Sequence, residues 1–120
     1  MAKILVVDDS TTMRQMVSFT LVDAGHDVVE AEDGNKALNA ARGKKFDLVI
    51  TDVNMPGMNG IDLVKCLRDI PEFKFTPILV LTTESAQEVK SRGRDAGATG
   101  WLVKPFSPDV LLATLKKVLD

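Results

Sequence analysis

Five short runs rich in branched apolar residues divide the chain into repeating units. Such runs are typical of strands that are covered on both faces in a parallel sheet. The second run contains more polar residues, so we expect it at an edge of the sheet. The expected strands cover residues 3–7, 27–32, 47–52, 77–81 and 99–103.

Between these runs, apolar side chains recur three and four residues apart, which predicts helices. Ser10 or Thr11 can cap the first helix, and Gly25 is a natural stop for it. Ser107 can cap the last helix, with Pro108 at its first position. The first three expected helices cover residues 11–24, 35–42 and 61–70. The residues expected to face the core are Met13, Met16, Val17, Thr20, Leu21, Ala24, Ala37, Leu38, Ala41, Leu63, Val64, Leu67, Ile70, Leu111, Leu112, Leu115, Val118 and Leu119.

A fourth helix over residues 85–95 has the weakest pattern. Val89 is nearly its only large apolar residue, and Gly93 lies inside it, where glycine costs about 1 kcal/mol relative to alanine. We therefore expect this segment to be locally labile, with weak protection from hydrogen exchange.

Strands that alternate with helices predict parallel pairing, because a helical crossover returns each strand in the same direction. The crossovers should be right-handed. The expected fold is thus α/β, with a five-stranded parallel sheet and helices on both of its faces. Its length of 120 residues suits a single domain over residues 1–120. The spacing of the runs leaves the order of the strands open.

Polar and charged side chains follow the expected strands at the point where each one ends. The first strand is followed by Asp8 and Asp9, and the third ends in Asp52. The fourth ends at Thr82, and the fifth is followed by Lys104. Because parallel strands have their carboxyl ends at one edge of the sheet, we expect three carboxylates, a hydroxyl and an ammonium group to meet there.

Carboxylates placed close together repel one another, and a hard divalent cation relieves that repulsion. A few oxygen ligands with room for water suit Mg²⁺, which favours sites that also hold phosphate groups. A carboxylate beside Mg²⁺ can attack phosphorus and form an aspartyl phosphate. A lysine within reach would pair with a carboxylate at rest and with phosphate oxygens afterwards.

The composition narrows the partners and the compartment. A net charge of −2 gives no electrostatic case for nucleic acid, and no apolar run reaches the roughly 18 residues of a membrane span. Cys66 is the only cysteine, which fits a reducing compartment and a simple helix thiol. With no signal peptide in the sequence, we expect a cytoplasmic protein. His26 is the only histidine and is expected to be a loop residue rather than a metal ligand.

The strand ends and the turns beside them resemble a known family. The residues concerned are Val7-Asp8-Asp9-Ser10, Asp52 with Met55-Pro56-Gly57-Met58-Asn59-Gly60, Leu81-Thr82 and Lys104-Pro105-Phe106. The sequence is similar to the receiver domains of two-component response regulators, and most similar to the stand-alone CheY type. The resemblance runs from Lys3 to Leu119. It implies a flavodoxin-like, doubly wound fold with strand order 2-1-3-4-5.

The resemblance also implies the roles of the acidic residues. Asp52 is the expected phosphoacceptor. Asp9 and Asp52 are expected to contact Mg²⁺ together with the backbone carbonyl of Asn54, while Asp8 acts nearby, often through water. Asn54 and Glu84 correspond to positions that tune the lifetime of the phosphoryl group, and this pair resembles regulators that lose phosphate quickly.

Further roles concern the response to phosphorylation. Thr82 is expected to hydrogen-bond the phosphoryl oxygens and Lys104 to pair with the phosphoryl group, with a cis bond between Lys104 and Pro105. Trp101 stands where the family usually has Tyr or Phe, at the switch aromatic that turns inward when Thr82 moves. Tryptophan is bulkier than either residue, so the extent of its inward burial is left open.

The function implied is a response regulator that a CheA-like histidine kinase phosphorylates on Asp52. The signal would pass through the surface of the fourth helix, the fifth strand and the last helix, in chemotaxis. The expected protein is a monomer with no output domain and no membrane or nucleic-acid partner. It would catalyse only its own phosphorylation and dephosphorylation. The expected partners are the kinase, a flagellar motor switch or phosphotransfer protein, and a phosphatase.

Alternatives remain at this stage. Within the family, the chain could be a phosphate sink or a phosphorelay receiver outside chemotaxis. A haloacid-dehalogenase-like phosphatase would need a second acid two residues after the nucleophile, where this chain has Asn54. A flavodoxin-like carrier of FMN is disfavoured by the acidic edge, which would repel the phosphate of that cofactor.

Overall fold

The structure is a computed structural model that describes residues 2–55, 57–83, 91 and 94–119. It contains a parallel sheet of five strands in the order β2-β1-β3-β4-β5. The strands are β1 (Lys3–Val7), β2 (Asp27–Ala31), β3 (Leu48–Asp52), β4 (Ile78–Thr82) and β5 (Gly100–Val103). The fold class and the strand order implied by the resemblance are both confirmed.

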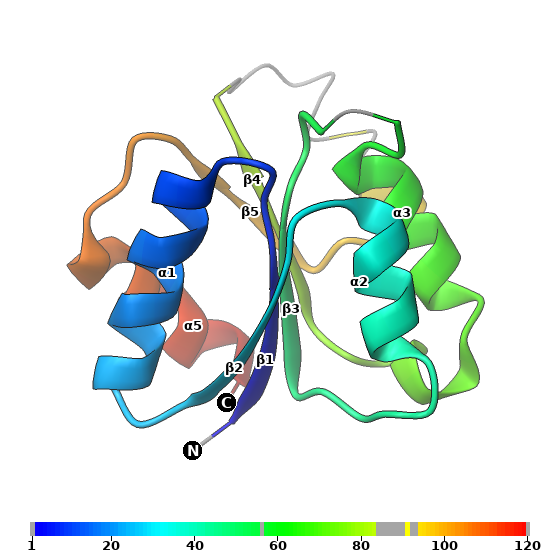
Figure 1. Cartoon of the computed structure of the whole chain (residues 1–120), viewed down its shortest axis with the longest axis horizontal. Helices are drawn as coiled ribbons and strands as arrows, with labels where there is room; N and C mark the ends of the chain where they lie inside the picture. The colour runs from blue at the N-terminus through cyan, green and yellow to red at the C-terminus, as the bar shows by residue number, and fades with distance from the viewer. Residues whose placement is uncertain (1, 56, 84–90, 92–93, 120) are drawn as a thin grey trace.

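Helices cover both faces of this sheet, as Figure 1 shows, with α1 and α5 on one side and α2 and α3 on the other. They are α1 (Thr11–Asp23), α2 (Gly34–Ala41), α3 (Gly60–Arg68) and α5 (Pro108–Leu119), and a 3₁₀ turn, η1 (Pro71–Phe73), follows α3. Element boundaries lie within two residues of the expected ones. The 3₁₀ turn was not expected.

The sheet separates two apolar clusters. Strands β3 and β4 are buried along their whole length, which explains their continuous apolar sequence. Strand β2 lies at an edge and is half-exposed, as expected. The cluster under α1 and α5 contains Leu21 and Leu111, and the cluster under α2 and α3 contains Phe46 and Phe73.

Side-chain caps define where the helices begin. The Ser10 hydroxyl accepts a hydrogen bond from the Met13 N–H, and the Ser107 hydroxyl accepts one from the Val110 N–H. Both caps were expected from the sequence. Helices α2 and α3 are capped in the same way by Asp33 and Asn59.

The expected core faces are mostly correct, and one residue is wrong. Val17 and Leu21 of α1 are buried, as are Leu63, Val64 and Leu67 of α3. Ala24 is exposed, because it is the C-cap of α1 and the chain turns away at the next residue, Gly25, where φ is 94°. Thr20 is buried as expected, and Ser18, which was not expected to face the core, is buried as well.

The segment of the expected fourth helix lies largely outside the described residues. Ser91 and residues 94–96 are helical, and the other residues from 84 to 93 lie outside, so the expected lability of this helix stays a prediction. Within the described part of the chain, no helix is long and apolar enough to cross a membrane.

Candidate functional site

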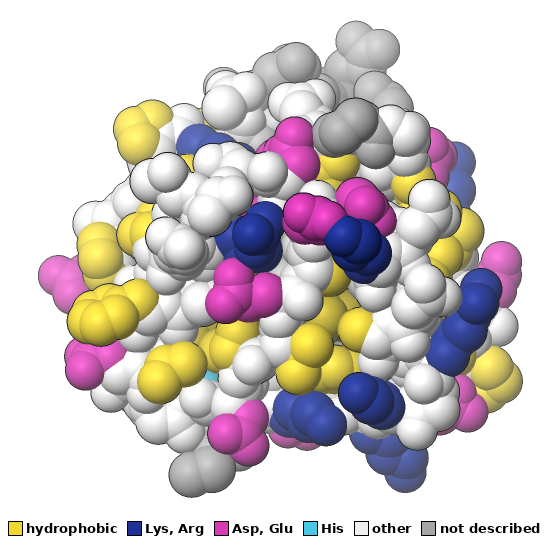
Figure 2. All heavy atoms as spheres, viewed as in Figure 1, with side chains coloured by type: hydrophobic (Ala, Val, Ile, Leu, Met, Phe, Trp, Pro, Cys, Tyr) yellow, Lys and Arg dark blue, Asp and Glu magenta, His cyan; other side chains and the backbone are white. Residues whose placement is uncertain are grey.

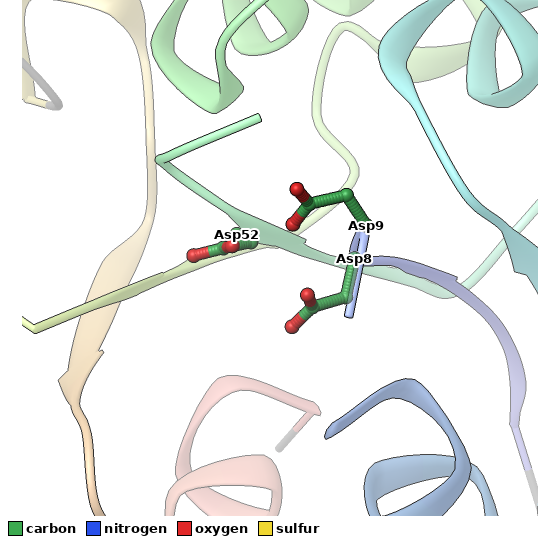
Figure 3. A group of neighbouring side chains, drawn as sticks. All are labelled: Asp8, Asp9 and Asp52. Carbon is green, nitrogen blue, oxygen red and sulfur yellow. The ribbon is translucent and has the colours of Figure 1, made fainter. Parts of the chain in front are cut away.

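Three aspartates meet at the carboxyl edge of the sheet. Asp8 and Asp9 follow β1, and Asp52 is the last residue of β3. One carboxylate oxygen from each lies within 4.8 Å of the others. Figure 3 shows the three side chains projecting to the same side of these strand ends. Asp8 and Asp52 are only 1% and 6% exposed, whereas Asp9 is exposed to solvent. The expected gathering of strand-end acids is therefore confirmed.

The position of Asp8 follows from the way β1 passes into α1. The Asp8 N–H continues the sheet by donating to the carbonyl of Ala31 on β2, at 3.1 Å. The Asp8 carboxylate then accepts a hydrogen bond from the Ser10 N–H at 2.9 Å, and Ser10 in turn caps α1. The strand, the acidic turn and the helix are thus joined by local hydrogen bonds, and this turn carries two of the three carboxylates.

The position of Asp52 depends on a close approach between β3 and the start of α3. The Gly60 N–H donates to the carbonyl of Val53 at 2.9 Å. A Cβ atom at position 60 would lie 2.0 Å from the carbonyl oxygen of Asp52, so only glycine fits there without moving the strand end. The loop after β3 is closed tightly, and Asp52 remains at the end of a buried strand.

Lys104 bridges two of the acids. Its ammonium nitrogen lies 3.1 Å from Oδ1 of Asp52 and 3.4 Å from Oδ2 of Asp8. The Lys104 N–H donates to the carbonyl of Thr82 at 2.7 Å, and the Lys104–Pro105 peptide bond is cis. The pairing of this lysine with a carboxylate and the cis bond were both expected from the sequence.

The electrostatics of the site favour a further cation. Burial raises the pKa of the Asp52 carboxyl, Lys104 opposes that rise, and the charges of Asp8 and Asp9 add to it. One ammonium group thus faces three carboxylates. An all-oxygen donor set with an exposed member, Asp9, leaves room for water, which suits Mg²⁺ better than a metal that prefers nitrogen or sulfur ligands. The residues present therefore fit a magnesium site.

Thr82 and Trp101 lie on neighbouring strands. Thr82 ends β4 and is buried, while Trp101 on β5 is half-buried and packs against the cluster under α2 and α3. Trp101 pairs with Val80, two residues before Thr82, so the side chains of Thr82 and Trp101 are on the same face of the sheet. The guanidinium of Arg94 lies over the indole ring, 5.6 Å from its centroid.

A family model for the response regulator receiver domain matches residues 4–116. The chain belongs to this family. Phosphorylation on an aspartate and Mg²⁺ binding at an acidic pocket are general properties of receiver domains, which act in signalling. The family that the strand ends indicated is thus confirmed.

Curated relatives and solved structures agree with this assignment. The chain is 46% identical to chemotaxis protein CheY-3 of Vibrio cholerae, over 98% of this chain and 88% of the relative. It is 40% identical to chemotaxis protein CheY of Pseudomonas aeruginosa, over 98% and 96% of the two chains. The structure of chemotaxis protein CheY4 of Vibrio cholerae matches with a TM-score of 0.97 and 57% identity, over 99% of both chains.

Of the two positions expected to tune the phosphoryl lifetime, the structure describes one. Asn54 lies two residues beyond Asp52 and is exposed, beside the acidic site. Glu84 lies outside the described residues. The roles assigned to both residues, and the Asn54 carbonyl as a metal ligand, stay predictions.

Two arginines near the strand ends were missed from the sequence. Arg14 of α1 contacts the turn that holds Asp8, and Arg68 of α3 contacts loops at the opposite edge of the sheet. Arg14 falls on the fourth residue after Ser10, the helix cap, which places it one helical turn above the acidic turn. That spacing could have marked it as a neighbour of the site, whereas nothing in the local sequence marks Arg68.

Proposed function

We propose that this receiver domain accepts a phosphoryl group on Asp52 from a histidine kinase and signals in chemotaxis by binding another protein. The observation that carries the proposal is the buried Asp52 carboxylate, with Lys104 at 3.1 Å and two further acids beside it. The names of the relatives, which are chemotaxis proteins, support chemotaxis as the setting.

Each of the chain's own residues has a part in the transfer. An oxygen of Asp52 attacks the phosphorus, and the bond between phosphorus and the histidine nitrogen breaks with its electron pair remaining on the nitrogen. Lys104 favours the ionised, nucleophilic form of Asp52, which burial disfavours. The Lys104 ammonium then pairs with an oxygen of the transferred group. Thr82 donates its hydroxyl to another phosphoryl oxygen.

The acids would hold the metal. Asp9 and Asp52, with the backbone carbonyl of Asn54, are the proposed Mg²⁺ ligands, and Asp8 acts through water. Bound Mg²⁺ would neutralise negative charge on the phosphoryl group. The pocket is partly open through Asp9, which allows a phosphoryl donor to reach Asp52.

The signal would be a shift between two conformations of the same fold. Thr82 moves toward the phosphoryl oxygens, and Trp101 turns inward on the same face of the sheet. States that differ by a few kcal/mol are enough for such a population shift. The output surface would be formed by the fourth helix, β5 and α5, and a flagellar motor switch or a phosphotransfer protein is the proposed target. A phosphate sink remains the alternative, and a separate phosphatase is a further proposed partner.

The first test is kinase-dependent phosphorylation. Wild type should become labelled by a phosphorylated CheA-like kinase in Mg²⁺ buffer, and Asp52→Asn should not. Asp62→Asn is the matched control, because Asp62 is an exposed acid in the first turn of α3. A label that persists on Asp52→Asn would contradict the proposal. Capture of a motor or phosphotransfer protein by the beryllofluoride form would then identify the target.

The second test uses the only tryptophan of the chain. Trp101 is the one strong intrinsic fluorophore, since the sequence has no tyrosine. Saturating beryllofluoride with Mg²⁺ should change its emission if the ring moves. An unchanged spectrum, with binding shown by calorimetry, would count against the switch role while leaving the phosphorylation of Asp52 standing.

The lifetime of the phosphoryl group is a third property to measure. The Asn54 and Glu84 pair leads us to propose short-lived phosphorylation. A half-life of hours in Mg²⁺ buffer would contradict this and would favour a relay that stores phosphate.

A further inference from the structure

Arg14 connects the acidic turn to the edge strand of the sheet. Its Nη1 donates to the backbone carbonyl of Asp8 at 2.7 Å, and its Nε donates to the carboxylate of Glu30 at 3.0 Å. The side chain is only 15% exposed, although it begins on a surface helix. A half-buried guanidinium held by two elements is well placed to fix the backbone between them.

We propose that Arg14 is a positioning residue that holds the Asp8–Asp9 turn in the shape that binds the divalent cation. The inference rests on the proposed function, because it concerns the same acidic site. It adds a residue that touches neither the metal nor the phosphoryl group.

The need for such a residue follows from the turn itself. Asp8 and Asp9 carry like charges on adjacent residues, which repel each other and the nearby Asp52. Asp8 is held by the Ala31 carbonyl, the Ser10 N–H and Arg14. Within the described part of the chain, no hydrogen bond orients the exposed side chain of Asp9. The position of that ligand therefore depends on the backbone of the turn, which Arg14 holds.

The charge of Arg14 is directed away from the ligand oxygens. Its two hydrogen bonds go to a backbone carbonyl and to Glu30, whereas Lys104 sits directly on the carboxylates of Asp8 and Asp52. Figure 2 shows acidic and basic side chains side by side near the middle of the face that is turned toward the viewer in Figure 1. Arg14 can thus order the turn while Glu30 balances its charge, so that it competes little with a bound cation.

A hollow beside Arg14 should allow substitutions at this position without loss of the fold. A cavity of about 290 Å³ is lined by Arg14, Glu30, Ala31, Glu32 and Lys36. The hollow is open to solvent, so water can fill the space that a shorter side chain at position 14 leaves and can hydrogen-bond the polar groups there. We therefore expect variants at this position to keep the fold.

Two substitutions separate positioning from charge. Arg14→Lys keeps the positive charge but lacks the fork that binds two partners, and Arg14→Met removes the charge and keeps an unbranched stem about as long as the aliphatic part of arginine. If Arg14 acts by position, both variants should bind Mg²⁺ about tenfold more weakly, the lower range for groups that orient metal ligands. If it acts only by charge, the lysine variant should equal wild type and the methionine variant should bind Mg²⁺ more tightly.

The measurement is calorimetric titration of Mg²⁺ at constant ionic strength. Arg42→Met is the matched control, since Arg42 is an exposed arginine at the C-cap of α2, and it should bind like wild type. Glu30→Gln keeps Arg14 but weakens its anchor, so a loss of about threefold is expected. Melting curves without Mg²⁺ establish folding. Should Arg14→Met not fold, Arg14→Lys and Glu30→Gln decide the question.

A second readout separates metal binding from chemistry. Phosphorylation by acetyl phosphate should need more Mg²⁺ in Arg14→Lys, yet its maximal rate should return to within about twofold of wild type. Normal Mg²⁺ affinity in Arg14→Lys, or tighter binding in Arg14→Met, would overturn the inference. If wild type itself fails to bind Mg²⁺, the proposed function fails and this inference fails with it. If wild type binds Mg²⁺ and the Arg14 variants bind it with the same affinity, this inference fails and the proposed function stands.

Discussion

The two ends of the parallel strands use charged side chains in opposite ways. The end where the strands finish is called the carboxyl edge, and the end where they begin is called the amino edge. At the carboxyl edge, Asp8, Asp9 and Asp52 crowd together, and the charges of the first two help to raise the pKa of Asp52. At the amino edge, charged side chains bond to backbone groups instead. Asp47 accepts from the Lys3 N–H at 2.8 Å, and Arg68 donates to the carbonyl of Gly97 through two nitrogens, at 3.0 and 2.8 Å.

The difference shows where stability and chemistry lie in this fold. Arg68 also donates to the carbonyls of Phe73 and Thr76, at 2.6 and 2.7 Å, and so joins the loop before β4 to the loop before β5. Such contacts stabilise the native state. The acidic edge keeps like charges near one another in a buried place, which destabilises the native state until a cation or a phosphoryl group arrives. Substitutions at the two edges should therefore change stability in opposite directions.

The largest effect is expected at the amino edge. Arg68→Ala should lower the free energy of unfolding by about 3 kcal/mol, because several backbone carbonyls lose a charged donor at once. Urea unfolding followed by circular dichroism measures this change. Lys65→Ala, an exposed residue of the same helix, should change stability by less than about 0.5 kcal/mol. A loss below about 1 kcal/mol for Arg68→Ala would contradict a stabilising role for the charged contacts at the amino edge.

The next effect concerns the metal. Mg²⁺ at ten times its dissociation constant should raise the free energy of unfolding of wild type by about 1.4 kcal/mol, since it binds only the folded carboxyl edge. Removal by EDTA should reverse this gain. The same titration of Asp52→Asn should give a smaller gain, because a ligand carboxylate is missing. Equal gains in both proteins would place the cation elsewhere.

Asp52→Asn should also stabilise the protein without metal, by about 1 kcal/mol at neutral pH. The amide keeps the shape of the side chain and removes one of three crowded charges. Thermal melting in EDTA measures the difference between the two proteins. Asp62→Asn serves as the control, because that exposed acid at the start of α3 favours the helix and its loss should bring no gain. A destabilised Asp52→Asn would show that the Lys104 pair outweighs the crowding.

The stability that Asp52→Asn gains over wild type should depend on pH in a defined direction. The pKa of Asp52 is raised above 3.8, mainly by burial, so the folded chain keeps this proton to a higher pH than the unfolded chain. Between 3.8 and the raised pKa, folded wild type binds more protons than unfolded wild type, so its free energy of unfolding falls as pH rises. The advantage of Asp52→Asn should therefore be full above the raised pKa and disappear below 3.8. An advantage that grows toward acid pH would contradict the sign.

The smallest effect is expected for Asp47→Ala at the amino edge. The substitution removes one acceptor from the Lys3 N–H in an exposed place, where water can replace it, so a loss of about 0.5 kcal/mol is expected. Chemical denaturation with several repeats can measure it. An increase in stability would mean that even a single charge at this edge opposes folding.

Much of the site could be predicted from the sequence. Apolar runs that end in Asp8, Asp52, Thr82 and Lys104 place these residues at strand ends, because parallel strands share one carboxyl edge. The helix caps Ser10 and Ser107 were equally readable, since capping is a local interaction. The error at Ala24 arose because helical spacing alone does not show where the chain leaves the helix.

The sequence by itself determined the alternation of strands and helices, the acidic strand ends and the family. Only the tertiary structure decided which groups the lysine and arginine side chains contact. Lys104 reaches both Asp8 and Asp52, Arg14 holds a backbone carbonyl of the acidic turn, and Arg68 joins the loops before β4 and β5. Local periodicity reports which face of an element is apolar, whereas the partner of a long side chain depends on elements that are distant in the chain. Those contacts exist only once the sheet has been assembled in its particular strand order.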